Sequence, residues 1–286
     1  MGNRAIRLKE FEPHLDFLTS PSEEYRALRG GNPVGSDFRV RTDNDGFIIS
    51  GERTAPKKIV GLGDSVLECI YVHEGNRICA QIEQGLDNGI QVLNGGYSGA
   101  TSLHLLNTIL NKIIPLWPAG IFLMTGIMDL EATFKVRSFW SDDTYLRSVF
   151  EIGGEPGGWD QNFRPNMDVE NRARLINTTI MACRNFGLPI CYISTPHLQM
   201  YEGYYVKTRF SRPEYEERIS NRRRANATVG SICLASAIPY YDIEGAFAQR
   251  PELFHDDIHL NDEGTVVLAE ALADQGFFRL LRHWAG

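Results

Sequence analysis

The sequence predicts an α/β fold built on a parallel sheet of five strands. From residue 58 onward, short β-rich apolar runs alternate with longer segments of helical pattern, which is typical of βαβ units. With 286 residues, the chain is long enough to bury a self-sufficient core. The runs expected to form strands are Lys58–Leu62, Ile90–Leu93, Gly120–Met124, Pro189–Ser194 and Ile238–Tyr241.

The segments between these runs carry amphipathic helical stripes, because apolar residues recur every three or four positions. We expect a further helix from Arg212 to about Ala235, with Pro213 tolerated in its first turn. Another should begin at an Asn261 or Asp262 cap. The stripes are Ile78, Ile82 and Leu86; Leu103, Leu106, Leu110 and Ile113; and Val169, Ala173, Ile176 and Ile180.

Residues 1–57 break this rhythm, and we expect them to extend a domain spanning 58–286. Asp37–Thr42 alternates polar and apolar residues, and Asp43–Gly46 is a strong turn signal before the apolar Phe47–Ser50. This order predicts a β-hairpin leading into the first core strand. Two long aromatic-rich connections, at about 137–164 and 196–215, suit either a lid over an acyl or sugar pocket or a cover for the sheet edge.

Charge and cysteine content exclude several classes of protein. The 29 Lys and Arg residues face 36 Asp and Glu, a net charge of −7, which argues against a nucleic-acid partner. Five cysteines without a CxxC pair are expected to be reduced and mostly buried, with no disulfide framework. No run reaches the roughly 20 apolar residues of a membrane span, and the N-terminus lacks a secretory signal pattern. We therefore expect a cytoplasmic protein; the oligomeric state stays open.

Four loops at the expected carboxyl ends of strands hold the chemically distinctive residues. They are Gly61–Ser65, Asn94–Gly99, Thr125–Asp129 and the late His255–His259. Ligands in open α/β sheets bind beyond these strand ends, so the loops should converge on one site. A serine at a tight turn, a glycine turn offering N–H groups, and a late Asp/His pair are the parts of a serine nucleophile site.

These loops resemble the sequence blocks of the SGNH hydrolase superfamily, also called GDSL esterases. Each block is weak alone, but four in order across roughly residues 58–275 form a specific pattern. The resemblance implies a flavodoxin-like three-layer α/β/α sandwich, with an N-terminal β extension as in some members. The matching blocks are GDS at Gly63–Ser65, N-x-G-x-x-G at Asn94–Gly99, G-x-x-D at Gly126–Asp129 and D-x-x-H at Asp256–His259.

The resemblance also implies roles for particular residues. Ser65 would be the nucleophile, His259 the general base and Asp256 its partner. The backbone N–H groups of Ser65 and Gly96 would donate to the oxyanion. Further candidates for substrate contact on the same rim are Asp64, Met128, Asp129 and His197. Among these, the residues themselves favour a cap of the turn as the role of Asp64 and a surface-loop position for His197.

Position 128 departs from the family pattern, since members usually carry an Asn there whose amide donates to the oxyanion. A thioether donates no hydrogen bond, and losing one such donor costs about 2.7–4 kcal/mol. Three explanations stay open. Another donor, such as Thr125 or a loop side chain, replaces the amide; the substrate is an activated acyl group used for transfer; or the protein binds its ligand without catalysis.

Competing interpretations of single motifs are weaker. Ser98 nearly fits a G-x-S-x-G elbow, but a cap for a helix starting near Thr101 explains it better. The Gly61-x-Gly63 pattern lacks the third glycine of a dinucleotide site. The residues near His255 lack a metal-binding spacing, so we expect no metal and no other cofactor.

The motifs together favour a serine esterase or deacylase. Its partner would be a small-molecule ester or acyl donor, including carbohydrate-like esters, cleaved through an acyl-serine intermediate. An acyltransferase using the same triad is the alternative, and a non-catalytic binding module is a third. The negative net charge disfavours a strongly anionic substrate unless arginines such as Arg137, Arg164 or Arg209 offset it.

Overall fold

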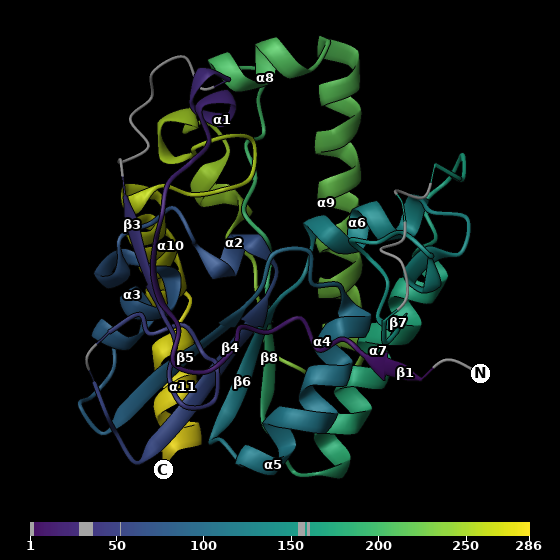
Figure 1. Cartoon of the computed structure of the whole chain (residues 1–286). Coiled ribbons are helices and arrows are strands. Elements are labelled where there is room, and N and C mark those ends of the chain that lie inside the picture. Colours follow the sequence, from purple (N-terminus) through teal and green to yellow (C-terminus); the bar gives the residue numbers. More distant parts are fainter. Residues whose placement is uncertain (1–2, 29–36, 52, 154–157, 159–160) are drawn as a thin grey trace.

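The computed structural model describes residues 3–28, 37–51, 53–153, 158 and 161–286. A five-stranded sheet forms its centre, with all strands parallel in the order β5-β4-β6-β8-β9 (Figure 1). The five predicted strands are therefore confirmed. Their bounds are β4 (Lys57–Gly63), β5 (Ile90–Gly96), β6 (Gly120–Met124), β8 (Ile190–Ile193) and β9 (Tyr240–Tyr241).

Helices cover both faces of this sheet, which confirms the three-layer sandwich (Figure 1). One face carries α2 (Ser65–Glu68), α3 (Ile78–Gln84), α10 (Asp262–Asp274) and α11 (Phe277–Ala285). The other carries α4 (Ser102–Thr108), a π-helical turn (Ile109–Ile113), α5 (Ile114–Leu116), α7 (Val169–Asn185) and α9 (Arg212–Ala235). The α6 helix (Ile127–Phe134) packs against α7 and α9.

The strands are apolar at nearly every position because both faces of the sheet are buried. Successive side chains point to opposite faces, so Ile59 joins the core under α3 and α10, while Val60 joins the core under α4 and α7. The predicted starts of α9 and α10 are also confirmed. A capping box of Ser211 and Glu214 starts α9, and the Asn261 side chain caps α10.

The order of the strands places a crevice at the carboxyl end of β4. From β4 the chain proceeds to β5 on one side and then crosses to β6 on the other. In doubly wound sheets this reversal is where ligands bind. The first of the four predicted loops, Gly61–Ser65, ends at this point: Gly61–Gly63 belong to β4, and Asp64 and Ser65 follow it directly.

The N-terminal residues add two small antiparallel ribbons. The β1 strand (Arg4–Ile6) pairs with β7 (Val149–Glu151), and β2 (Asp16–Thr19) pairs with β3 (Phe38–Arg41). The predicted turn at 43–46 is present and is closed by a Thr42–Ile48 bridge, but the longer partner of β3 is β2 rather than 47–50. The short α1 (Glu23–Ala27) lies above α2 in Figure 1.

The two aromatic connections contain little regular structure. The first holds a 3-10 turn (Ser138–Trp140) and β7, and the second holds α8 (Tyr204–Arg209). Residues 154–157 and 159–160 of the first connection, and 29–36 of the N-terminal extension, lie outside the described residues. Within the described ranges, every helix is too short or too polar to cross a membrane.

Candidate active site

The turn after β4 is held by Asp64, which is almost fully buried. Its Oδ1 accepts a hydrogen bond from the Val66 N–H at 3.0 Å, and its Oδ2 accepts one from the Met128 N–H at 3.3 Å. Burial raises the pKa of this carboxyl. Asp64 thus caps α2 and joins it to α6, which leaves its oxygens engaged with backbone and places Ser65 at the start of α2.

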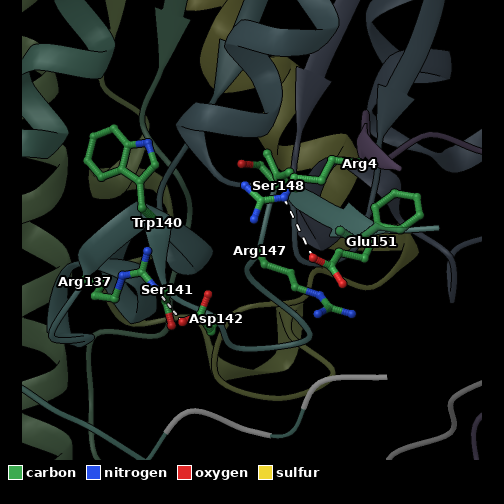
Figure 2. A pocket seen from close by; sticks show the side chains of 10 residues that line it. Arg4, Arg137, Trp140, Ser141, Asp142, Arg147, Ser148 and Glu151 are labelled. Carbon is green, nitrogen blue, oxygen red and sulfur yellow. Dashed lines mark hydrogen bonds and ion pairs between the residues drawn. The ribbon is translucent and has the colours of Figure 1, made fainter. Parts of the chain in front are cut away.

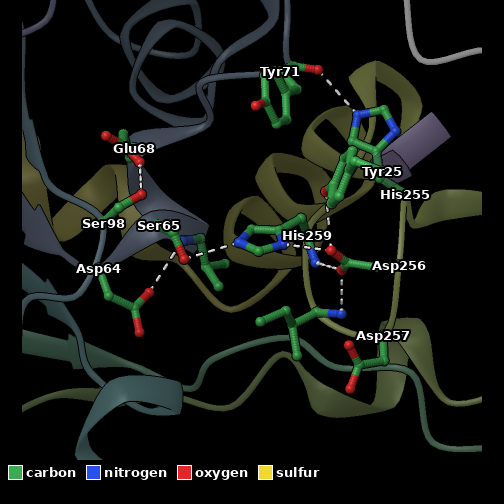
Figure 3. Close-up of polar contacts among 12 residues, drawn as sticks. Tyr25, Asp64, Ser65, Glu68, Tyr71, Ser98, His255, Asp256, Asp257 and His259 are labelled. Atoms are coloured by element: carbon green, nitrogen blue, oxygen red, sulfur yellow. Dashed lines mark hydrogen bonds and ion pairs between the residues drawn. The ribbon is translucent and has the colours of Figure 1, made fainter. Parts of the chain in front are cut away.

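Ser65, His259 and Asp256 form one hydrogen-bonded chain (Figure 3). His259 Nε2 lies 2.8 Å from Ser65 Oγ, and Nδ1 lies 2.7 Å from Asp256 Oδ2. A carboxylate only accepts, so the Nδ1 proton faces Asp256 and Nε2 is left to accept from the serine. The N–H groups of Ile258 and His259 donate to Asp256 Oδ1 at 2.8 and 2.7 Å, which fixes the carboxylate in its loop.

A fourth member of this hydrogen-bonded chain, not predicted from the sequence, is Tyr25 of α1. Its hydroxyl donates to Asp256 Oδ2 at 3.0 Å (Figure 3). The two residues are 231 positions apart, and no motif surrounds Tyr25, so only the folded chain reveals the contact.

A pocket of about 280 Å³ opens beside Ser65. Its wall is mainly apolar and aromatic, and Tyr145 brings the first aromatic connection into it. The second connection contributes no described lining residue; its Tyr201 and Phe210 rings pack on Tyr215 instead. The lining residues besides Ser65 and His259 are Tyr25, Val66, Cys69, Ile70, Tyr71, Val72, Ser98, Tyr145, His255 and Leu260.

Ser98 borders this pocket and is bonded to a buried acid, Glu68 of α2. The Ser98 hydroxyl donates a hydrogen bond to Glu68 Oε2. Burial raises the pKa of Glu68 to about 7. Lys9 donates to the Ser98 carbonyl oxygen at 3.3 Å, and burial lowers the pKa of Lys9 to about 8. The helix cap expected at Ser98 is wrong, because Thr101 caps α4.

The structure corrects the expected oxyanion role of Gly96. Its N–H donates to the Asn94 side-chain oxygen at 3.0 Å, inside β5. A Cβ at this position would lie 2.3 Å from the Glu68 nitrogen, so the glycine serves close packing of β5 on α2. Gly99, three residues later, lies beside Tyr145 of the pocket wall, since a Cβ at this position would meet the Tyr145 ring at 2.6 Å.

Met128 and Asp129 do not line this pocket, and the contact with substrate expected of them stays a prediction. The Met128 side chain packs on a small apolar cluster that includes Leu106 and Phe139. Asp129 is buried in an ion pair with Arg172 and also accepts from Ser102. Both residues follow β6 as predicted and belong to the first turn of α6, and neither lines the pocket that holds Ser65.

His197 is also placed away from Ser65, which corrects its expected substrate role. It is fully buried, and neither ring nitrogen has a hydrogen-bond partner among the described residues. Burial, helped by Arg222, lowers its pKa to about 3, so the ring is neutral. It lines a separate cavity of about 10 Å³ with Thr195 and Asn226, roughly the volume one water needs.

A larger pocket of about 550 Å³ lies apart from the triad and holds Arg137, one of the arginines singled out above (Figure 2). Arg4 and Arg137 pair there with Glu151 and Asp142, so much of the positive charge of this pocket is balanced.

The five cysteines are free and buried, as expected. Among the described residues, no cluster of three His, Cys, Asp or Glu side chains is arranged to hold a metal.

Solved structures of esterases share this fold. A catalytic mutant of an acetylxylan esterase from Geobacillus stearothermophilus matches with a TM-score of 0.54 at 15% identity, covering 79% of this chain and 97% of its own. An acetyl xylan esterase matches with 0.53 at 14%, covering 76% and 98%. An alpha/beta hydrolase from the metagenome of Lake Arreo, Spain, matches with 0.53 at 17%, covering 80% and 99%.

The chain therefore has the same α/β fold as these esterases, which agrees with the fold that the four sequence blocks predicted. Identities of 14–17% show a shared fold and do not by themselves assign an activity. No protein-family model and no curated protein matches the sequence.

Proposed function

We propose that the protein is an SGNH-type serine hydrolase that cleaves a carboxylic ester. The observation that carries this proposal is the hydrogen-bonded chain from Asp256 through His259 to Ser65, at the mouth of an apolar pocket. The fold neighbours lend support, since two are catalytic mutants of the Geobacillus esterase, one at an aspartate and one at a serine.

The proposed reaction has two half-reactions. His259 Nε2 takes the Ser65 proton as Oγ attacks the ester carbonyl, and Asp256 stabilises the imidazolium that forms. Collapse of the tetrahedral intermediate breaks the ester bond, and the leaving alcohol receives that proton from His259. Water, deprotonated by His259, then attacks acyl-Ser65 and releases the carboxylic acid, with the proton returned to Ser65.

Backbone N–H groups would stabilise the intermediate. The Ser65 N–H, at the first position of α2, is one donor. Because the Gly96 N–H is already bonded to Asn94, we assign the second to Gly99, which follows Ser98 of the pocket wall and lies beside Tyr145. Such donors act most strongly where water is excluded, and the apolar wall of the pocket favours that.

The pocket also suggests the size of the acyl group. Its volume of about 280 Å³ falls just under the usual range of roughly 300–1,000 Å³ for small-molecule sites. Val66, Val72 and Leu260 in the wall favour a short apolar acyl chain. For the alcohol we propose a carbohydrate-like group, in line with the acetylxylan esterases among the fold neighbours.

A fluorophosphonate probe tests this function, because it reacts only with an activated serine. We expect intact-mass analysis to show one probe adduct on the wild-type protein and none on Ser65→Ala. Ser220→Ala, which removes an exposed serine of α9, is the matched control and should label normally. Labelling of Ser65→Ala would refute Ser65 as nucleophile, and an unlabelled wild-type protein would favour the binding module.

Hydrolysis of a series of p-nitrophenyl esters then measures acyl preference. We expect kcat/KM to peak at short acyl chains and to fall once the chain outgrows the pocket. Adding an alcohol acceptor separates hydrolysis from transfer. If the product is almost entirely the new ester, with little free acid, the acyltransferase replaces the esterase.

A further inference from the structure

The proposed hydrolase lacks a side-chain donor where its family pattern has one. Position 128 is Met, and its side chain packs away from the pocket. Thr125, the replacement considered from sequence, is buried and its hydroxyl does not line the pocket. Ser98 does line the pocket, together with Ser65.

Strand register explains why these two serines share one pocket. Gly63 of β4 pairs with Gly96 of β5, the last residues of the two strands, and the Tyr97 N–H continues this pairing to the Gly63 carbonyl at 3.1 Å. Ser65 and Ser98 each follow two residues after this pair. In Figure 3, Ser98 lies on the side of Ser65 away from His259.

We infer that the Ser98 hydroxyl donates a hydrogen bond to the oxyanion in the proposed reaction, taking the place of the missing amide, and that Glu68 controls this donation. The inference rests on the proposed function. Ser98 would then be a catalytic residue, and Glu68 a positioning residue that acts through it.

The control follows from counting protons, because a serine hydroxyl has one proton to donate. A Glu68 carboxylate can only accept, so it takes the Ser98 proton and leaves none for the oxyanion. A Glu68 carboxylic acid donates its own proton to Ser98 Oγ, which frees the serine proton to point into the pocket. Protonation of Glu68 therefore switches the donor on.

The surroundings of Glu68 permit both the carboxylate and the carboxylic acid near neutral pH. The side chain is almost fully buried at the end of α2, and this burial holds its pKa at about 7. Ionised Asp64 favours the acid, whereas the cationic form of His259 and the bond from Ser98 favour the carboxylate. The other titratable or charged groups that face Glu68 are Lys9, Cys69, Arg77 and Tyr145.

Two variants at Ser98 test the donor. Removing one oxyanion donor typically costs about 10²–10³ in rate, so Ser98→Ala should lower kcat by that factor and leave KM nearly unchanged, because the bond forms only in the transition state. Ser98→Thr keeps a hydroxyl and should retain most of the activity. A wild-type kcat in Ser98→Ala, or a loss confined to KM, overturns the inference while the esterase itself stands.

A Glu68→Gln variant tests the control, and it also serves if Ser98→Ala fails to fold. The Gln amide donates to Ser98 Oγ at every pH, as only the acid form of Glu68 does. The ratio of variant to wild-type kcat should therefore stay near one below pH 7 and rise above it, as wild-type Glu68 ionises. A ratio that does not change with pH overturns the role of Glu68. Absence of ester turnover in the wild-type protein would instead refute the proposed function.

Discussion

Replacing Asp129 with Asn tests whether this carboxylate holds helices together or contacts substrate. Its Oδ1 accepts from the Ser102 N–H at 2.6 Å, and its Oδ2 accepts from Arg172 Nε at 3.2 Å. Arg172 in turn donates to the Ala225 carbonyl at 2.6 Å. The pair thus joins α4, α6, α7 and α9, and both side chains are 1% exposed.

The magnitude follows from this burial. Removing one partner of a buried ion pair leaves the other charge uncompensated and costs about 3–5 kcal/mol. Asn keeps the shape but turns an acceptor into an NH₂ group among donors, so Asp129→Asn should lose about that much free energy of unfolding. This is a large part of the roughly 5–15 kcal/mol of an ordinary domain. Asp142→Asn is the matched control, since Asp142 pairs with Arg137 in solvent and is 81% exposed.

Urea unfolding followed by tryptophan fluorescence measures both variants, and ester hydrolysis is measured at a temperature where each is folded. We expect a lower urea midpoint with unchanged KM for Asp129→Asn. For Asp142→Asn we expect a free energy of unfolding within about 0.5 kcal/mol of wild type. An unchanged midpoint together with a raised KM would refute the structural role and return Asp129 to the substrate site.

Three further outcomes are expected. Tyr25→Phe removes a hydrogen bond to the Asp256 carboxylate, worth about 1.5 kcal/mol, and should lower kcat about tenfold; a wild-type rate would show that the bond is dispensable. Burial raises the pKa of all five thiols, that of Cys69 to about 12. A thiol reagent at pH 8 should therefore modify no cysteine in the native protein and all five after denaturation. Rapid labelling of Cys69 in the native protein would contradict its burial. Gly96→Ala should destabilise the fold, because its Cβ would lie 2.3 Å from the Glu68 nitrogen. Gly75→Ala is the control and should not, because the space around Gly75 is open. Equal urea midpoints for the two variants would count against tight packing of β5 on α2.

The sheet and the hydrogen-bonded arrangement of Ser65, His259 and Asp256 could be predicted because their signals are local. A strand that ends in Gly-Asp-Ser positions its own serine, and the three-residue spacing of Asp256 and His259 fits one loop. Parallel strands then bring their carboxyl ends to one rim whatever lies between them. These inferences needed no knowledge of distant contacts.

The remaining site residues depend on contacts that no local pattern records. Asp129 follows β6 as expected, but its partner Arg172 lies 43 residues later on another helix. Tyr25 and Lys9 reach the site from the N-terminal segment. Gly96 was misassigned because its sequence position does not reveal that the Asn94 side chain takes its N–H.

The hydrogen bonds that link Tyr25, Asp256, His259 and Ser65 have a consequence for how the proposed activity arises during folding. Its members come from an early helix, the first turn of the sheet and a late loop, and His259 lies 194 positions after Ser65. A partly folded molecule that has formed only the turn after β4 contains Ser65 but has not yet placed His259, its proposed base, beside it. For the proposed hydrolase, turnover would therefore report completion of the whole sandwich, and its recovery during refolding should be the last signal to return.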